Sequence, residues 1–289
     1  MKKKNNLFYG LWSYMILLCV ILVVFAFIFV SCSAPSEAGS APPAQNTGAG
    51  GSGSGGASGP APSPGASGQA SDPPAASPSQ SPDLPPPTRL AETEDMGQDY
   101  IDRFIFLGDS TTFGMGAYGV VSTDSVWTPL PGTLTLNQWS FTAILFPDTG
   151  EELLIPDAVE IKKPEYLMIT LGVNGVSFMD EEYFKSEYTS LVNTVAEKSP
   201  GTKIILNSIF PVAASYKYQG DINNEKVNAA NEWIEQIARD TGTRYLASNS
   251  VLFGADGYLP ESYQNGDGLH LTKESFELVF AYIRTHGYI

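Results

Sequence analysis

Cysteine is almost missing from this sequence, which has only two among its 289 residues. Both of them, Cys19 and Cys32, belong to an apolar segment near the amino terminus. The chain beyond Cys32 therefore has no disulfide, no thiolate nucleophile and no cysteine ligand for a metal ion. A domain of about 200 residues buries a core large enough to be stable without such cross-links.

Histidine and cationic side chains are also scarce. His270 and His286 are the two histidines. With only these two and no cysteine beyond Cys32, the chain has few ligands for zinc, which disfavours a zinc site. His286 lies in the carboxyl-terminal tail and is expected at the surface. Lysine and arginine number 16 against 31 acidic residues, which leaves a formal net charge of -15. Three of the cations occupy positions 2–4, so the rest of the chain is strongly acidic. This balance argues against nucleic acid as a partner.

Phosphate-binding motifs are missing as well. No Gly-Lys pair followed by Ser or Thr occurs, which excludes a P-loop. Residues 114–119 fit G-x-G-x-x-G, but they lie several residues beyond the preceding strand. No acidic residue follows at the distance of about 20 positions that a dinucleotide site requires. We expect no cofactor and no metal.

The amino terminus carries the one long apolar run. Residues 7–30 have no charge and follow lysines at positions 2–4. Such a run is long enough to span a bilayer, with the lysines in the cytoplasm. Residues 29–32, Phe-Val-Ser-Cys, also resemble the end of a lipoprotein signal. Residues 1–32 are predicted to be a signal anchor or a lipoprotein signal, and either places the remainder outside the cytoplasm, held at the cell membrane.

Residues 33–88 consist almost wholly of Gly, Ser, Ala and Pro. A segment of this composition cannot bury a core, so we predict a disordered linker that holds a domain away from the membrane. Residues 89–289 remain, enough for one folded domain, which we expect to be a monomer.

Short apolar runs and amphipathic segments alternate in this domain. The runs are typical of buried parallel strands, and the amphipathic segments have the spacing of helices. Because helix-length connections join the strands, we expect an α/β fold with a mainly parallel sheet covered on both faces. The predicted strands lie at 104–108, 166–171, 203–207 and 244–246, and the predicted helices at 180–199, 224–240 and 272–285.

The stretch from residue 120 to residue 164 is the hardest to assign. Residues 126–127, 133–136 and 141–145 have strand-like character and are separated by prolines. A short helix is predicted at 157–163, where Pro164 ends it.

Three motifs place polar side chains at one edge of the predicted sheet. Ser110 follows the first strand, Asn174 follows the strand at 166–171, and Asp267 precedes His270 by three residues ahead of the last helix. Open α/β sheets bind their ligands at the carboxyl ends of their strands. The Asp-x-x-His spacing also lets a turn bring the carboxylate against the imidazole ring.

These motifs resemble those of the SGNH hydrolases, also called the GDSL esterase/lipase superfamily. The similar blocks are Gly108-Asp109-Ser110, Gly172-Val173-Asn174 and Asp267-Gly268-Leu269-His270, and the resemblance covers residues 104–289. It implies a flavodoxin-like three-layer α/β/α sandwich. One position departs from the family pattern, because Gly175 follows the asparagine where Asp or Glu is usual.

The resemblance implies a serine esterase that acts through an acyl-enzyme. Ser110 would be the nucleophile, His270 the base, and Asp267 the acid that orients the imidazole. The side-chain amide of Asn174 would form part of the oxyanion hole together with the N–H of Ser110.

The resemblance leaves two matters open. A glycine of the family's second block should complete the oxyanion hole; Gly132 is our choice, and Gly150 is the alternative. The expected substrates are small-molecule or polysaccharide acyl esters. This expectation rests only on the predicted location outside the membrane. A non-catalytic carbohydrate-binding module on the same fold and an O-acyltransferase remain alternative functions.

Overall fold

The structure is a computed structural model, and it describes residues 88–289. The predicted anchor at 1–32 and the predicted linker up to residue 87 lie outside the described residues. Thr88, the last residue of the predicted linker, already accepts a hydrogen bond from the N–H of Tyr245 at 2.9 Å. No helix within residues 88–289 has the length and apolar character needed to cross a membrane.

The centre of the domain is a parallel sheet of five strands in the order β2-β1-β5-β6-β7. This is the strand order of flavodoxin-like folds, in which the order reverses beside the first strand. Each predicted apolar run forms a strand of this sheet, as expected. The strands are β1 (Phe104–Gly108), β2 (Val126–Trp127), β5 (Tyr166–Thr170), β6 (Lys203–Asn207) and β7 (Arg244–Leu246).

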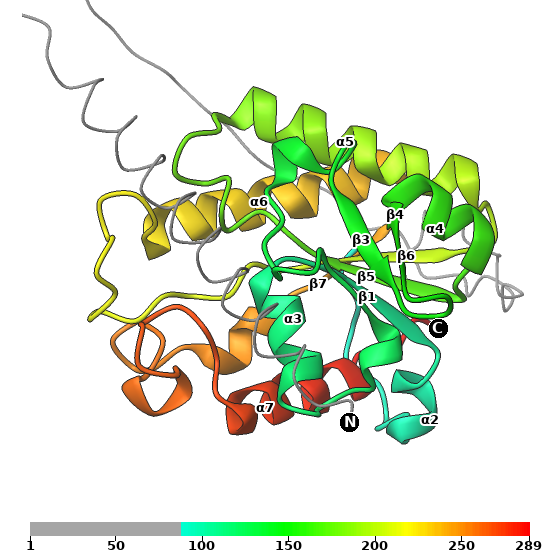
Figure 1. The fold of residues 1–289 in the computed structure, drawn as a ribbon. Helices are drawn as coiled ribbons and strands as arrows, with labels where there is room; N and C mark the ends of the chain where they lie inside the picture. The colour runs from blue at the N-terminus through cyan, green and yellow to red at the C-terminus, as the bar shows by residue number, and fades with distance from the viewer. Residues whose placement is uncertain (1–87) are drawn as a thin grey trace, which may run out of the picture. The chain divides into compact units, whose positions relative to one another are not determined.

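Helices cover both faces of the sheet, which gives three layers (Figure 1). The helices α4 (Ile155–Lys162), α5 (Glu181–Lys198) and α6 (Asn224–Thr241) lie on one face. The helices α2 (Gly97–Ile101), α3 (Ser110–Ala117) and α7 (Lys273–Arg284) lie on the other. The predicted α/β/α sandwich is therefore confirmed.

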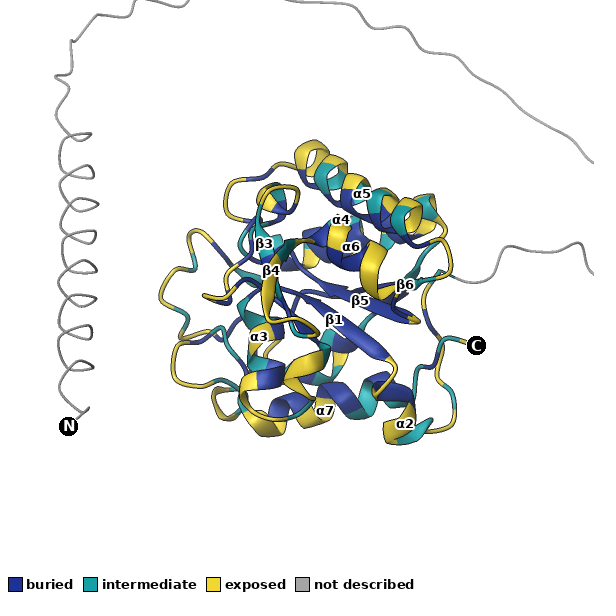
Figure 2. Cartoon of the chain, turned by 45° about the vertical axis from the view of Figure 1, so that its right-hand side comes forward, coloured by how far each residue is buried: buried dark blue, intermediate teal, exposed yellow. Residues whose placement is uncertain are grey.

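The strands of the central sheet are mostly apolar because both of their faces are largely buried (Figure 2). Along β1, Ile105 and Leu107 pack into the core shared with α4, α5 and α6. Phe104 and Phe106 point the other way, into the core shared with α2 and α7. Burying one such side chain stabilises the fold by about 1.5–3 kcal/mol relative to leaving it exposed.

The connection between β2 and β5 differs from the prediction. Residues 133–136 form no strand; a short 3-10 helix, η2 (Leu136–Gln138), begins there instead. Leu134 and Leu136 are both buried, so their spacing imitates the alternation of a strand. Burial of alternate side chains does not require a pairing partner, and none of the described strands pairs with this segment.

A separate two-stranded antiparallel ribbon follows. Its first strand, β3 (Ala143–Phe146), corresponds to the predicted strand-like segment at 141–145. Its second strand, β4 (Glu151–Leu154), is not among the predicted strands. Most of its side chains are exposed, so it lacks the apolar pattern by which strands are recognised.

Two asparagines of α6 hold the loop that follows β6. The side chain of buried Asn231 accepts a hydrogen bond from the N–H of Ile209 at 2.7 Å and donates one to the Ile209 carbonyl at 2.9 Å. Asn224 makes the same pair of bonds with Val212, at 2.8 and 3.0 Å. Beyond the end of β6 the backbone no longer pairs with a neighbouring strand, and these side-chain bonds satisfy its N–H and carbonyl groups instead. They also fix the loop at the carboxyl edge of the sheet.

We predict that Asn231→Ala lowers the free energy of unfolding by about 2–6 kcal/mol. The substitution leaves the N–H and the carbonyl of buried Ile209 without partners, at about 1–3 kcal/mol each. Urea unfolding measures the loss. Asn228→Ala is the matched control, since Asn228 is exposed on the same helix and its loss should stay within about 0.5 kcal/mol. Equal losses in the two variants would contradict the structural role of Asn231.

Candidate active site

Ser110 lies where β1 passes directly into α3, as the helix's first residue. The Asp109 carboxylate caps the helix by accepting the N–H of Thr111 at 3.0 Å. Gly108 is required at this turn, because a Cβ there would lie 2.2 Å from the carbonyl oxygen of Thr170. The N–H of Ser110 has no acceptor within the helix and lies at the positive end of its dipole.

The structure brings Ser110, His270 and Asp267 into one chain of hydrogen bonds. Nε2 of His270 lies 2.8 Å from Oγ of Ser110. Nδ1 of the same ring lies 2.6 Å from Oδ2 of Asp267. The hydroxyl therefore faces one ring nitrogen while the carboxylate holds the other, although Ser110 and His270 are 160 residues apart in the sequence.

The Asp-x-x-His segment forms a tight turn closed by its own carboxylate. Oδ1 of Asp267 accepts the N–H groups of Leu269 and His270, at 2.8 and 2.9 Å. Gly268 has a φ of 83°, and a Cβ there would lie 2.7 Å from the Cα of Tyr216. Only glycine fits this close approach without strain. The turn thus fixes the carboxylate and the imidazole together.

The hydrogen bonds of this turn keep Asp267 charged. Partial burial acts to raise the pKa of Asp267, but the bonds from the His270 ring and from the N–H groups of His270 and Leu269 outweigh it. The net result is a pKa below the ordinary value of 3.8. A charged carboxylate holds the proton on Nδ1 and stabilises the cationic ring that forms when Nε2 takes a proton.

Asn174 lies in the turn after β5, the strand next to β1. Gly172 begins this turn with a φ of 129°, and its carbonyl accepts the N–H of Gly175 at 2.8 Å. Nδ2 of Asn174 donates to the carbonyl of Leu134 at 3.2 Å. An amide nitrogen carries two hydrogens, so this bond leaves a second donor that the described residues do not occupy.

Gly132 packs beside α3, but its N–H is occupied. It has a φ of 77°, and a Cβ there would lie 3.0 Å from Cγ of Phe113, one helical turn beyond Ser110. Its N–H donates to the carbonyl of Pro129 at 2.7 Å. The N–H of Gly150 is likewise occupied, in the turn between β3 and β4. The assignment of Gly132 to the oxyanion hole stays a prediction, and it requires the turn at Pro129 to open.

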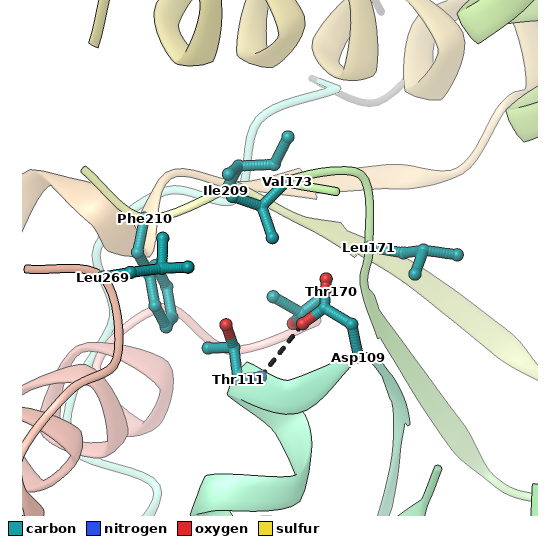
Figure 3. A pocket seen from close by; sticks show the side chains of 8 residues that line it. All are labelled: Asp109, Thr111, Thr170, Leu171, Val173, Ile209, Phe210 and Leu269. Atoms are coloured by element: carbon teal, nitrogen blue, oxygen red, sulfur yellow. Dashed lines mark hydrogen bonds between the residues drawn. The ribbon is translucent and has the colours of Figure 1, made fainter. Parts of the chain in front are cut away.

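A small apolar pocket lies beside these residues, where α3 begins and β5 and β6 end (Figure 3). None of its lining residues is among the predicted site residues. A signal was available, since each of them lies within three residues of a motif residue or of the end of a predicted strand. The lining comprises Asp109, Thr111, Thr170, Leu171, Val173, Ile209, Phe210 and Leu269.

The arrangement supplies what acyl transfer through a serine requires. A hydroxyl faces a base, an acid orients the base, and backbone and amide donors lie at the same edge of the sheet. Within residues 88–289 there is no group of three or more His, Cys, Asp or Glu side chains that could hold a metal ion.

The sequence matches the GDSL-like lipase/acylhydrolase family over residues 106–278, well over half of the chain. The protein therefore belongs to the GDSL-like lipase/acylhydrolase family. This agrees with the resemblance noted from its motifs. No curated protein matches the chain.

Two solved structures are similar to the described domain. A GDSL-like lipase from Bacteroides thetaiotaomicron is 19% identical, with a TM-score of 0.46, over 64% of this chain and 87% of that chain. The periplasmic domain of a lipopolysaccharide acetyltransferase from Salmonella ser. Paratyphi A is 18% identical, with a TM-score of 0.44, over 63% of this chain and 82% of that chain.

The buried Asp109 generates a prediction about pH and stability. Asp109 is 2% exposed, and burial raises its pKa from 3.8 to about 6, although hydrogen bonds from Thr111 and the charge of His270 act to lower it. The folded state therefore binds this proton more tightly than the unfolded state. The contribution to stability is present at about pH 4 and is lost as the pH rises to about 6.

Asp109→Asn keeps a side-chain oxygen for the N–H of Thr111 and removes the titration. We expect the stability of this variant relative to the natural protein to rise by about 2–3 kcal/mol between pH 4 and pH 7. Urea unfolding at several pH values measures this difference. A difference that stays constant across the range would contradict the raised pKa.

Proposed function

We propose that this protein is a serine esterase that hydrolyses short-chain acyl esters of carbohydrate or cell-wall polymers outside the cytoplasm. The observation that carries the proposal is the chain of hydrogen bonds from Ser110 through His270 to Asp267, at 2.8 and 2.6 Å. Membership in a family of lipases and acylhydrolases supports ester hydrolysis as the reaction.

In the first half of the reaction, Oγ of Ser110 attacks the carbonyl carbon of the ester. The new Oγ–C bond forms while the hydroxyl proton passes to Nε2 of His270. Asp267 stabilises the resulting imidazolium through Nδ1. When the tetrahedral intermediate collapses, the C–O bond to the alcohol breaks, and the alcohol oxygen takes the proton from His270. The acyl group is left on Ser110.

In the second half, water replaces the alcohol. Nε2 of His270 takes a proton from water as the water oxygen attacks the acyl carbon. The Oγ–C bond then breaks, Ser110 recovers its proton from His270, and the carboxylic acid leaves. An O-acyltransferase would differ only in the acceptor, because the hydroxyl of a sugar would take the place of water at this step.

The developing oxyanion needs hydrogen-bond donors at the same edge of the sheet. The N–H of Ser110, at the first position of α3, and the second N–H of Asn174 are proposed as donors, because neither has an acceptor among the described residues. One donor of this kind typically lowers the barrier by about 3 kcal/mol. Gly132 is proposed as a third donor, recruited when its turn opens.

The location outside the cytoplasm rests on residues that precede the described domain. Lysines at 2–4 and the apolar run at 7–30 support an anchor in the membrane, and residues 33–88 support a linker. A domain held there by a long polar linker has access to acyl groups of wall polysaccharide or peptidoglycan. Its strong negative charge makes nucleic acid and other polyanions unfavourable partners.

We predict that Ser110→Ala lowers kcat/KM for para-nitrophenyl acetate by roughly 10⁴-fold or more, since no nucleophile remains to form the acyl-enzyme. Stability should change by less than about 0.5 kcal/mol, because the substitution is small and partly exposed. Ser140→Ala, which changes an exposed serine outside the hydrogen-bonded chain, is the control and should keep full activity.

A fluorophosphonate probe gives an independent test of the same assignment. The natural protein and Ser140→Ala should be labelled, and Ser110→Ala should not. If the natural protein neither reacts with the probe nor hydrolyses any ester, the domain is a binding module. If transfer to an added sugar outpaces hydrolysis, the enzyme is an O-acyltransferase.

The nature of the anchor is predicted to be visible in the intact mass of the protein purified from membranes. A full-length mass indicates a signal anchor formed by residues 7–30. Loss of residues 1–31 together with a lipid increment indicates acylation at Cys32, where two or three chains would be needed for firm attachment. A mass that lacks residues 1–32 with no lipid would contradict membrane attachment.

A further inference from the structure

A cleft lies between the loop that follows β5 and the start of α6. Figure 1 shows α5 and α6 side by side on one face of the sheet. Residues 176–180 form one wall of the cleft, and side chains between Asn223 and Trp233 form the other. Its volume of about 530 Å³ lies in the range of cavities that hold small ligands.

This cleft continues the edge of the sheet that carries the candidate active site. Val176, which lines it, follows Asn174 by two positions, and Oγ of Ser177 donates to the carbonyl of Asn174 at 3.4 Å. The order β1-β5-β6 places the segment after β5 between Ser110 and the loop that leads to α6. A long molecule that has its ester group at Ser110 can therefore extend past Asn174 into the cleft.

The loop that forms the first wall is held by its own backbone. The N–H groups of Phe178 and Met179 both donate to the carbonyl of Gly175, at 3.1 and 2.9 Å. Met179 is buried and lines the cleft, and a Cβ at Gly175 would lie 2.8 Å from its sulfur. Gly175 is the position that departs from the family pattern, so this departure lets Met179 pack here. Phe178 remains 56% exposed at the wall of the cleft.

Trp233 supplies a second aromatic surface, from α6. It is partly buried, and its ring packs on the ring of Phe184 with the two centroids 5.5 Å apart. This contact holds the indole in place before a ligand arrives, which lowers the entropic cost of binding. Phe178 and Trp233 line the same cleft from opposite walls. The face of an aromatic ring is negative, so it attracts the C–H groups of a sugar ring.

The polar groups of the cleft suit hydroxyl groups and disfavour anions. One oxygen of Asp180 caps α5, and the other remains as an acceptor; Glu225 adds a second carboxylate. Lys226 also lines the cleft, but its Nζ already donates to the carbonyls of Gly220 and Asp221, at 3.0 and 2.9 Å. A ligand with carboxylates or phosphates would therefore meet net negative charge, whereas sugar hydroxyls can donate to both carboxylates.

From this lining we infer that the cleft is a binding subsite for an uncharged sugar ring of a polysaccharide, with Phe178 and Trp233 as its stacking surfaces. The inference deepens the proposed function and rests on it, because this sugar belongs to the polymer whose acyl group passes to Ser110. It selects polysaccharide esters over small-molecule esters, a choice that the hydrogen-bonded chain from Ser110 to Asp267 leaves open.

The first test measures the binding of oligosaccharides without ester groups to the full-length protein in detergent. Trp127 and Trp139 are 1% and 5% exposed, so a ligand in the cleft acts on the fluorescence of Trp233. We expect chitopentaose, which is uncharged, to shift the emission in a saturable way. The shift should vanish in Trp233→Phe, which keeps an aromatic ring against Phe184. A pentamer of galacturonic acid, with a carboxylate on each ring, should bind at least roughly 10-fold more weakly.

The second test separates recognition of the polymer from the chemistry at Ser110. Phe178→Ala removes an exposed ring and keeps the backbone bonds of its loop, so the variant should fold. We expect the ratio of kcat/KM for O-acetylated glucomannan to that for para-nitrophenyl acetate to fall roughly 10-fold, through a higher KM for the polymer. Tyr118→Ala is the matched control, because Tyr118 is an exposed aromatic residue at the end of α3 away from Ser110. This control should keep the ratio of the natural protein.

The outcomes distinguish this inference from the function on which it rests. If para-nitrophenyl acetate is hydrolysed but chitopentaose and glucomannan do not bind, the sugar subsite is wrong and the esterase stands. Equal changes in Phe178→Ala and Tyr118→Ala also overturn the subsite. Equal affinity for the galacturonic acid pentamer overturns the restriction to uncharged rings. If chitopentaose binds at Trp233 and no ester is hydrolysed, the cleft is the sugar site of a binding module and the esterase is wrong.

Discussion

A parallel sheet places the carboxyl ends of all its strands at one edge, and the candidate site of this protein depends on that constraint. The order β2-β1-β5-β6-β7 puts β1 in contact with both β2 and β5. The segments that follow these strands must therefore meet, although Ser110 and Asn174 are far apart in the chain. Helix-length crossovers return the chain to the opposite edge each time, so only the segments after the strands can build the site.

Meeting at an edge does not by itself fix side chains to within an ångström. In this domain the loops at the edge are held by side chains that form hydrogen bonds with the loop backbone. The Asp267 carboxylate closes the turn that carries His270, and Asn231 and Asn224 close the loop after β6. Asp109 holds the start of α3 at the expense of burying a carboxyl group. The hydrogen bond by which Asp109 caps α3 offsets part of the energetic cost of that burial, and it fixes the start of the helix on which Ser110 lies.

The sequence was sufficient to predict the main strands of the sheet, because these strands are largely buried on both faces and appear as short, mostly apolar runs. The same reasoning could not find β4, whose side chains are mostly exposed, and it mistook Leu134 and Leu136 for a strand because both are buried. Ser110, Asn174, Asp267 and His270 could be proposed because each sits in a motif at a strand or helix end. Gly132 could be chosen only by analogy with the family, because the sequence does not show which acceptor the N–H of a glycine bonds. The small pocket beside the start of α3 is lined by residues of several segments, so its size depends on how they pack and could not be predicted from the sequence.

The occupied N–H of Gly132 bears on how an oxyanion hole could be completed during the reaction. At rest this N–H donates to the neutral carbonyl of Pro129. A neutral hydrogen bond contributes about 0.5–1.5 kcal/mol net, whereas a bond to a charged group contributes about 1.5–3 kcal/mol. Exchanging the Pro129 carbonyl for an oxyanion is therefore favourable by about 1 kcal/mol, provided that the turn moves without other losses. The positive φ of Gly132 and the ring of Phe113 against it both restrict that movement. Since the exchange gains energy only when negative charge develops, it would stabilise the transition state and leave the bound ester unaffected, which is the condition for raising kcat.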